Sequence, residues 1–307
     1  MTAQAVPSAL CISKLNVIYG KEMHAVRNVD LDVAPGRCLG LVGESGSGKS
    51  SIVLAVLGLL PKSARVTGSI TVGTQETVGA AESTMRRLRG KTLGLVAQDP
   101  MASFDPLMSV AGSVAEAWRV HRVRPRHHDV EESLEHLGID HAHARAKLRP
   151  HMWSGGMLQR AAIAAASAHH PSVIIADEPT SALDADRADA ILESLRATQA
   201  AIVLVSHDLE LVARYSDEVA VMYAGEVIER GPSEQVLHHP RHPYARALLE
   251  ASPRSGHGLP KPLLGAPPRL DAKACGCPFE PRCAQSQPAC RELAPELVAG
   301  VACWESS

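Results

Sequence analysis

The chain has 307 residues, of which 45% are hydrophobic and 21% charged, as is typical of a globular protein with a packed core. Its formal net charge of −2 gives no basic footprint for nucleic acid. The longest apolar run, residues 52–60, is about half of the roughly 18 residues that indicate a membrane span. The N-terminal stretch lacks the basic and apolar regions of a secretory signal. We therefore expect a cytoplasmic protein that does not itself enter the bilayer.

The first hundred residues carry mainly strand patterns. Residues 10–33 alternate apolar and polar side chains, as half-buried antiparallel strands do. Short apolar strands are predicted over 38–42, 67–72 and 93–97. A glycine-rich loop follows the first of these strands and leads into a predicted helix over 50–60.

The remaining pattern predicts an α/β protein. Residues 107–170 are rich in Ala, Leu, His and Arg and predict a helical segment. Buried strands are predicted over 173–176 and 202–205, with a helix over 185–198 between them, and a hairpin over 219–228. Apolar strands that alternate with helices indicate a parallel sheet flanked by helices. The fold we expect is this core with an antiparallel β subdomain, an α-helical subdomain and a short Cys-rich C-terminal extension.

The glycine-rich loop fits the phosphate-binding pattern G-x-x-x-x-G-K-[ST] and lies between a strand and a helix, as this motif requires. Its backbone N–H groups and the helix N-terminus would bind phosphate. Lys49 would reach the β and γ phosphates of ATP, and the Ser50 hydroxyl would ligate Mg²⁺. The residues that we predict to bind the nucleotide here are Gly43, Glu44, Ser45, Gly46, Ser47, Gly48, Lys49, Ser50 and Ser51.

Two carboxylates, Asp177 and Glu178, follow the predicted strand over 173–176. Asp177 would hold Mg²⁺, directly or through water. Glu178 would be the general base that polarises the attacking water, a role that typically contributes ~10²–10⁴ in rate. A pair of solvated carboxylates at a strand end is the alternative interpretation. The phosphate loop on a neighbouring strand favours the catalytic one.

A Ser-Gly-Gly element at 154–156 precedes an alanine-rich helix and is weak evidence by itself. The element becomes informative because it lies in the sequence between the phosphate loop and the Asp177-Glu178 pair. The resulting order of motifs resembles that of the ATP-binding-cassette ATPases, over essentially the whole chain. The motifs that carry the resemblance are the phosphate loop, Gln98, Ser154-Gly155-Gly156, Asp177-Glu178, Ser181-Ala182-Leu183-Asp184 and His207.

The resemblance implies a head-to-tail dimer in which ATP lies between the phosphate loop of one cassette and the Ser-Gly-Gly signature of the other. It also implies roles for single residues. Tyr19 would stack on adenine, Gln98 would contact Mg²⁺ and the attacking water, and His207 would contact the γ-phosphate. Asp184 would contact the facing cassette. Trp153 departs from the family, which usually has Leu there, and we expect it to serve as an apolar anchor.

Several segments resemble more narrowly the dipeptide, oligopeptide and nickel importers. They are AQDPMASFDP around Gln98, SGGMLQR at 154–160, HPRHPYARALLEASP at 239–253 and the cysteine-rich tail. The resemblance implies two permease subunits, a second cassette ATPase that is often a paralogue, and an extracytoplasmic substrate-binding protein. The chain would then lie on the cytoplasmic face of the membrane. Peptides are the expected cargo, and nickel or a metal chelate is the alternative.

Two other classes of function are alternatives to import. A soluble cassette that acts on nucleic acid usually has two cassettes, long coiled coils or basic arms, and the sequence shows one cassette, no heptad run and no basic patch. An exporter usually fuses its cassette to a membrane domain. The domain boundaries we expect place the cassette at 1–232, with its helical subdomain at about 107–170, and the extension at 233–307.

Within the extension, residues 252–269 are rich in proline and predict a linker, and the tail at 275–303 holds five of the seven cysteines. Cys277, Cys283, Cys290 and Cys303 form the pattern C-x5-C-x6-C-x12-C. Four thiolates suit a tetrahedral Zn²⁺ or an iron–sulfur cluster, and unligated thiols are a further alternative. The gaps are wider than those of zinc knuckles. The resemblance implies a structural [4Fe–4S] cluster, with Cys275 as a spare thiol.

Overall fold

The computed structural model describes residues 8–126, 128–181, 183–253, 259–268 and 276–306, and contains two β-sheets. The first is antiparallel, with the strand order β2-β1-β4-β5. The second has the order β10-β9-β3-β8-β7-β6 and is parallel except for the hairpin of β9 and β10. The α/β fold class with an antiparallel β subdomain is thereby confirmed.

The strands lie close to the predicted positions. Their bounds are β1 Leu10–Tyr19, β2 Met23–Val33, β3 Cys38–Val42, β4 Ala64–Val72, β5 Gln75–Glu76, β6 Leu93–Val96, β7 Val173–Asp177, β8 Ala201–Val205, β9 Glu218–Tyr223 and β10 Glu226–Pro232. All five residues of β3 and of β8 are buried, because helices and the antiparallel sheet cover both faces of the parallel sheet. In β1 and β2 the core-facing residues alternate with exposed ones, as sheets with one solvated face require.

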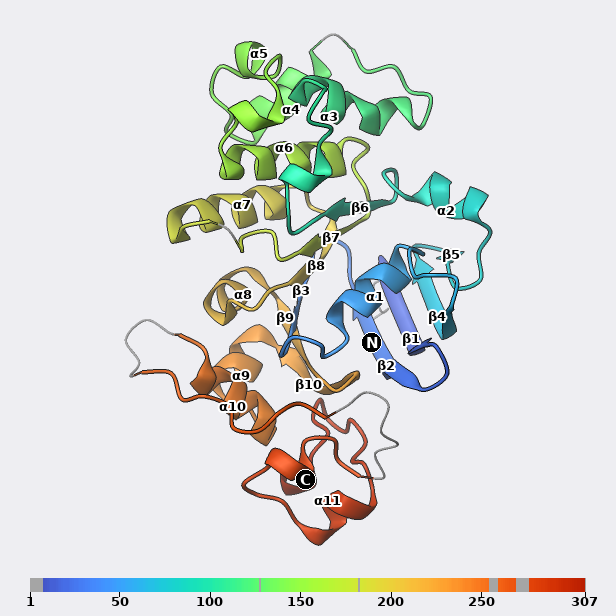
Figure 1. The fold of residues 1–307 in the computed structure, drawn as a ribbon, viewed down its shortest axis with the longest axis vertical. Coiled ribbons are helices and arrows are strands. Elements are labelled where there is room, and N and C mark those ends of the chain that lie inside the picture. Colours follow the sequence, from blue (N-terminus) through green and yellow to red (C-terminus); the bar gives the residue numbers. More distant parts are fainter. Residues whose placement is uncertain (1–7, 127, 182, 254–258, 269–275, 307) are drawn as a thin grey trace, which may run out of the picture.

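The helices cover the sheets and form one end of the molecule (Figure 1). Their bounds are α1 Lys49–Val56, α2 Glu82–Leu88, α3 Val110–Arg119, α4 Asp129–His136, α5 Ala142–Arg145, α6 Gly155–Ser167, α7 Ala185–Ala197, α8 Leu209–Tyr215, α9 Ser233–His238, α10 Pro243–Ala251 and α11 Pro288–Glu292. Helices α3 to α6 pack around their own apolar cluster, so the predicted helical segment is confirmed. Trp153 is buried in this cluster and its Nε1–H donates to the carbonyl of Arg145 at 3.1 Å, which makes it the anchor we expected.

Helix α1 is shorter than the prediction of 50–60. It ends at Val56 because Gly58 adopts a φ of +62° and closes the helix. The N–H groups of Gly58 and Leu59 donate to the carbonyls of Ala55 and Leu54 at 3.0 and 2.8 Å, which satisfies the last turn. The predicted helix was too long because the apolar run continues past Gly58, the glycine that ends the helix.

The C-terminal residues share the main core. Val236 in α9, Tyr244 in α10 and Phe279 belong to the same apolar cluster as β3, β8 and β9. The tail around α11 lies at the end of the molecule opposite to α3–α6, and the phosphate loop and α1 lie between the two ends (Figure 1). In the part of the chain that the structure describes, no helix combines the length and the hydropathy needed to cross a membrane.

Candidate functional site

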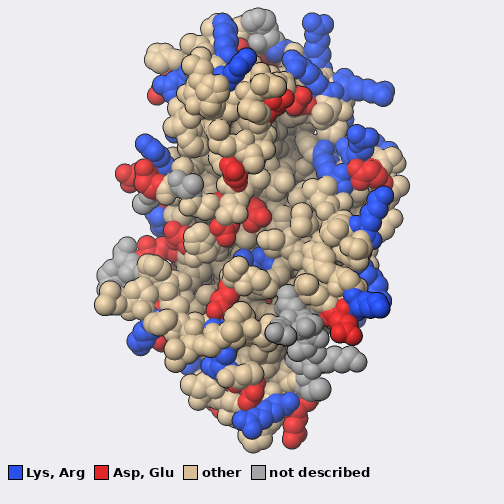
Figure 2. Space-filling view, viewed as in Figure 1, with Lys and Arg blue, Asp and Glu red and all other residues tan. Residues whose placement is uncertain are grey.

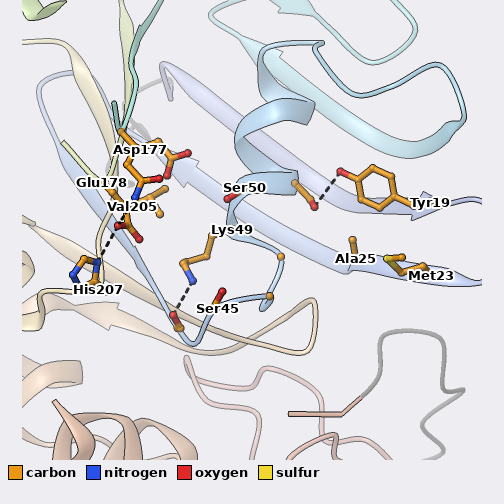
Figure 3. A pocket seen from close by; sticks show the side chains of 15 residues that line it. Tyr19, Met23, Ala25, Ser45, Lys49, Ser50, Asp177, Glu178, Val205 and His207 are labelled. Carbon is orange, nitrogen blue, oxygen red and sulfur yellow. Dashed lines mark hydrogen bonds and ion pairs between the residues drawn. The ribbon is translucent and has the colours of Figure 1, made fainter. Parts of the chain in front are cut away.

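A cavity of about 570 Å³ opens where the parallel strands β3, β7 and β8 end (Figure 3). Carboxyl ends of parallel strands are where α/β sheets bind ligands. The cavity is lined by Tyr19, Met23, Ala25, Gly43, Ser45, Gly46, Gly48, Lys49, Ser50, Ser51, Gln98, Asp177, Glu178, Val205 and His207. Twelve of these fifteen residues were predicted from the sequence, and they come from five separate stretches of the chain.

The phosphate loop has a shape that only glycine permits at two positions. Gly43 and Gly48 have φ values of +148° and +107°. A Cβ atom on Gly43 would lie 2.2 Å from the carbonyl oxygen of Met222, and one on Gly48 would lie 2.4 Å from that of Ala25. The loop thus packs directly against neighbouring backbone. Gly48 is the N-cap of α1, so the helix N-terminus and its partial positive charge face the cavity.

The Lys49 side chain turns back over the loop. Its Nζ donates to the carbonyl oxygens of Gly43 and Glu44 at 2.7 and 2.9 Å and to Oγ of Ser47 at 3.2 Å. Burial lowers the pKa of Lys49, and the nearby carboxylates, Glu178 first, oppose that shift. A cation held among backbone carbonyls at the rim of a cavity can transfer its hydrogen bonds to a phosphate.

Three predicted catalytic residues meet at one carboxylate. Oε2 of Glu178 accepts a hydrogen bond from Nε2 of Gln98 at 3.3 Å and lies 3.0 Å from Nδ1 of His207. Glu178 has a φ of +46°, in the left-handed region, which costs a non-glycine residue about 1–3 kcal/mol. Its N–H donates to the carbonyl of Val205 at 2.8 Å, which ties β7 to β8 at this point. Gln98 and His207 therefore fix the carboxylate where it can polarise water.

Asp177 lies beside this group at the end of β7. Burial raises the pKa of Asp177, the charge of Glu178 raises it further, and Lys49 opposes the shift. Two adjacent carboxylates that share one lysine form a site that a divalent cation would stabilise. The Ser50 hydroxyl lines the same cavity, so the oxygen ligands expected for Mg²⁺ fit together here.

An aromatic side chain closes the far end of the cavity. Tyr19, at the end of β1, places its hydroxyl 3.2 Å from Oγ of Ser51 in α1 (Figure 3). Met23 and Ala25, from β2, line the wall next to it and were not predicted. Both lie in a strand that gives no sequence signal for a ligand. This apolar corner suits a planar base, on whose face Tyr19 can stack.

Six residues predicted for the ATP site lie outside the cavity, and four of them are at the start of α6 or α7. Ser154 is the N-cap of α6 and accepts from the N–H of Met157 at 3.3 Å, with Gly155 and Gly156 in the first turn. Asp184 caps α7 in the same way and accepts from the N–H of Arg187 at 3.1 Å. The exposed Ser154 and Asp184 side chains make no contribution to the cavity of their own chain.

Glu44 and Ser47 belong to the phosphate loop but do not line the cavity either. Ser47 is buried beneath it. The Glu44 carboxylate turns away and forms an ion pair with Arg282 of the tail, at 2.7 Å from Nη1 to Oε2. Sequence reasoning missed this contact because 238 positions separate the two residues and neither lies in a recognisable paired motif.

Four of the five cysteines of the tail line one small cavity of about 20 Å³. Burial raises the pKa of Cys277 to about 11, and it also raises the pKa of Cys283. Within the described residues, however, no group of three or more His, Cys, Asp or Glu side chains is arranged so that it could hold a metal ion. Cys277, Cys283, Cys290 and Cys303 thus line one cavity but are not arranged as a metal site, and Cys275 lies outside the described residues.

A strand, a phosphate loop and a helix that face an Asp-Glu pair define a P-loop nucleotide-binding protein. Residues 26–181 match the family model described as "ABC transporter". The chain belongs to the ABC transporter family of ATP-binding proteins. Residues 228–290 match the model described as "Oligopeptide/dipeptide transporter, C-terminal region", so the resemblance drawn from the tail is confirmed.

The curated relatives carry related names. The oligopeptide transport ATP-binding protein OppD of Mycobacterium tuberculosis is 41% identical over 291 residues, which cover 91% of this chain and 47% of that protein. The protein of the same name from Lactococcus lactis subsp. cremoris is 39% identical and covers 82% of this chain and 77% of that one. The chain thus spans about half the length of the mycobacterial relatives that it matches.

Solved structures show the same fold. The cbiO1 protein of Clostridium perfringens, described as part of the ABC transporter complex cbiONQ, has a TM-score of 0.67 and 28% identity. The matched region covers 76% of this chain and 92% of the cbiO1 chain. The ATP-binding cassette MJ0796, solved as a dimer bound to ADP and phosphate, has a TM-score of 0.64 and 24% identity over 73% of this chain.

Proposed function

We propose that the chain binds and hydrolyses ATP to drive the uptake of peptides through an ABC importer. The observation that carries this proposal is the carboxylate of Glu178, held by Gln98 and His207 beside the phosphate loop. The names of the relatives and the match of the C-terminal region to oligopeptide and dipeptide transporters support the cargo class.

The chemistry follows from the side chains in the cavity. Mg²⁺, held by Ser50, Asp177 and Gln98, would neutralise the charge on the β and γ phosphates. Lys49 exchanges its bonds to loop carbonyls for bonds to phosphate oxygens. Glu178 accepts a proton from the attacking water, and His207 contacts the γ-phosphate and keeps Glu178 oriented. The helix N-terminus at Gly48 stabilises the negative charge that the products carry.

The active unit is a dimer of cassettes. Ser154, Gly155, Gly156 and Asp184 have no role in the cavity of their own chain, which is expected if they complete the site of a facing cassette. A second ATPase chain, identical or paralogous, would supply the same elements in return. Two such composite sites then form only when the two cassettes close on ATP.

A second cavity, of about 300 Å³, is proposed to receive the permease subunits. It lies between β6, α3 and α6, and is lined by residues that include Leu59, Leu95 and Phe104. Leu59 and Leu95 are 47% and 38% exposed, so an apolar segment of a membrane subunit could bury them. The chain would then sit peripherally on the cytoplasmic face of the membrane.

The test of this function is transport. The chain is co-purified with its permeases and partner cassette, reconstituted into liposomes and supplied with ATP, the binding protein and labelled peptides. Peptide accumulation is expected with the wild-type chain and none with Lys49→Ala, because the phosphate charge is left without its cation. Accumulation of nickel or of a metal chelate in place of peptides would overturn the cargo assignment, and accumulation with Lys49→Ala would overturn the energy source.

We also propose that the tail cysteines hold a structural [4Fe–4S] cluster. Cys277, Cys283, Cys290 and Cys303 surround one cavity, and the tail has few regular elements of its own to hold it together. Thiols with raised pKa values need a cationic centre to become thiolate ligands. The cluster would supply covalent cross-links among these segments.

The cluster is tested by anaerobic purification from iron-replete cells, with iron and acid-labile sulfide analysis and a visible spectrum. Iron, sulfide and a brown colour are expected from the wild-type chain. Cys283→Ala should lose all three, and Cys11→Ala, at an exposed position in β1, should lose none. A colourless protein without iron would rule the cluster out, and one zinc per chain would assign the cysteines to zinc.

A further inference from the structure

One side chain of the tail reaches into the phosphate loop. Nη1 and Nη2 of Arg282 lie 2.7 and 3.1 Å from the two carboxylate oxygens of Glu44, a bidentate ion pair. Nη1 also donates to the hydroxyl of Tyr223 at 3.2 Å. Only 5% of the Arg282 side chain is exposed. Two-point pairing of a planar guanidinium with a carboxylate fixes both direction and distance.

The backbone of Glu44 is held as well. Its N–H donates to the hydroxyl of Tyr244 in α10 at 2.8 Å. The rings of Tyr223, Tyr244 and Phe279 pack against one another with centroids 4.5 to 5.3 Å apart, and the Arg282 guanidinium lies over the rings of Tyr223 and Phe279. Two C-terminal residues therefore hold Glu44: Arg282 binds its side chain and Tyr244 binds its backbone N–H.

Glu44 needs a partner for an electrostatic reason. It is the one acidic side chain within the predicted phosphate loop, where the negative phosphates of a nucleotide are to bind. Its carboxylate also attracts Lys49, the cation that must reach those phosphates. Arg282 neutralises Glu44 and holds the carboxylate outside the cavity, so Lys49 and the loop N–H groups remain available to the nucleotide.

We propose that Arg282 is a positioning residue for the phosphate loop, through which the C-terminal extension sets the affinity of the chain for nucleotide. Arg282 lies in the short 3-10 helix Glu280–Arg282, between Cys277 and Cys283. The guanidinium is therefore carried by the short segment that joins these two cysteines. The extension acts on the ATP site of its own chain, in addition to any role it has in the stability of the tail.

This inference rests on the nucleotide-binding part of the proposed function, and it is tested on the purified full-length chain. The affinity for Mg²⁺ and a non-hydrolysable ATP analogue is measured by titration calorimetry. Arg282→Met should weaken binding by about tenfold or more, since charge-assisted hydrogen bonds contribute about 1.5–3 kcal/mol and 1.4 kcal/mol is a factor of ten. Arg282→Lys keeps the positive charge but cannot form the two-point pairing with the carboxylate. Its affinity for the analogue should lie between that of the wild-type chain and that of Arg282→Met.

The double variant Glu44→Gln, Arg282→Met separates positioning from damage to the fold. Removal of the unpaired carboxylate should restore a large part of the affinity that Arg282→Met loses. Arg291→Met is the matched control, because Arg291 is an exposed arginine of the same tail that pairs with Glu280 and does not touch the loop. It should bind the analogue as the wild-type chain does.

The outcomes are distinct. If the wild-type chain binds the analogue and Arg282→Met binds equally well, the positioning role is wrong while the proposed function stands. If the double variant is as weak as Arg282→Met, the loss reflects a disrupted tail and the inference is also wrong. If the wild-type chain does not bind the analogue, the proposed function itself fails. Should Arg282→Met not fold, Tyr244→Phe tests the second contact, and unchanged affinity there and in Arg282→Lys would overturn the proposal.

Discussion

Glu178 is held in an unfavourable backbone conformation with its carboxylate directed at Gln98 and His207. A group so constrained is placed for chemistry more than for stability. We predict that Glu178→Gln retains nucleotide binding while ATP hydrolysis by the assembled transporter falls by ~10²-fold or more, because the base is lost and the geometry is kept. Steady-state phosphate release and nucleotide titration measure the two effects.

The control for this variant is Glu193→Gln, on the exposed face of α7. It should change neither quantity. Near-normal turnover by Glu178→Gln in the assembled transporter would remove Glu178 from the role of general base, whatever the nucleotide affinity.

At the scale of single residues, the sequence located most of the cavity. Asp177, Glu178 and Lys49 could be predicted because each belongs to a short motif whose spacing follows from its chemistry. The pairing of Glu44 with Arg282 could not, since it depends on how the tail folds back over β9. Met23 was missed for another reason, because an exposed methionine in an antiparallel strand has no signature of its own.

The phosphate loop depends on two glycines that lack room for a side chain. We predict that Gly48→Ala abolishes measurable nucleotide binding and lowers stability, because its Cβ would lie 2.4 Å from the carbonyl of Ala25. Gly73→Ala is the matched control, with a φ of +59° and no atom within 4 Å of the new Cβ. It should cost only about 1 kcal/mol of stability and leave binding intact. Equal effects of the two variants on binding would contradict this account.

Helix α10, which carries Tyr244, begins at a buried histidine. Nδ1 of His242 accepts the N–H of Tyr244 at 3.0 Å. Burial, with a smaller effect of Arg246, lowers the pKa of His242 from 6.5 to about 4. Below about pH 6.5 the unfolded chain therefore binds a proton at this histidine, while the folded chain binds it only near pH 4. The contribution of His242 to stability is complete above pH 6.5 and decreases as the pH falls toward 4.

The decrease that His242 contributes between pH 6.5 and pH 4 is on the order of 3 kcal/mol. We predict that His242→Asn, which keeps a helix-capping oxygen, lowers the sensitivity of the unfolding midpoint to acid. The measurement is the thermal midpoint of wild type and variant from pH 7.5 to pH 5. Parallel curves for the two proteins would show that His242 is not the group responsible.

At the scale of elements, the sequence predicted whether a segment is a helix or a strand better than it predicted where that element ends. Buried strands such as β3 and β8 were found because they are short and apolar, and the hairpin of β9 and β10 because Ala224-Gly225 marks its turn. The end of α1 was misplaced, since Leu57, Leu59 and Leu60 continue the apolar run past the glycine that closes the helix. The apolar run gave no reason to place a stop at that glycine.

The whole molecule has the helical segment at one end and the cysteine tail at the other, with the nucleotide cavity between them (Figure 1). On the face seen in Figure 2, Lys and Arg side chains gather at the helical end, while Asp and Glu side chains lie over the middle. Charges of both signs therefore occur on this face.

At this scale the sequence indicated the fold class but not how the extension joins it. The sequence predicted a proline-rich linker over 252–269 and indicated no contact between the tail and the cassette. In the structure Phe279 enters the main core and Arg282 enters the phosphate loop. Such long-range packing depends on shape complementarity between distant segments, which periodicity and motif spacing do not record.

The central claim is that ATP is hydrolysed at a site that two cassettes complete together. It is tested most directly by the ATPase rate of the purified chain alone and in the assembled transporter, with Ser154→Arg beside the wild-type chain. The account predicts a weak rate for a dilute monomer, a large rise on assembly, and loss of the site formed by the partner's phosphate loop in Ser154→Arg. Full activity in a demonstrably monomeric sample would contradict it.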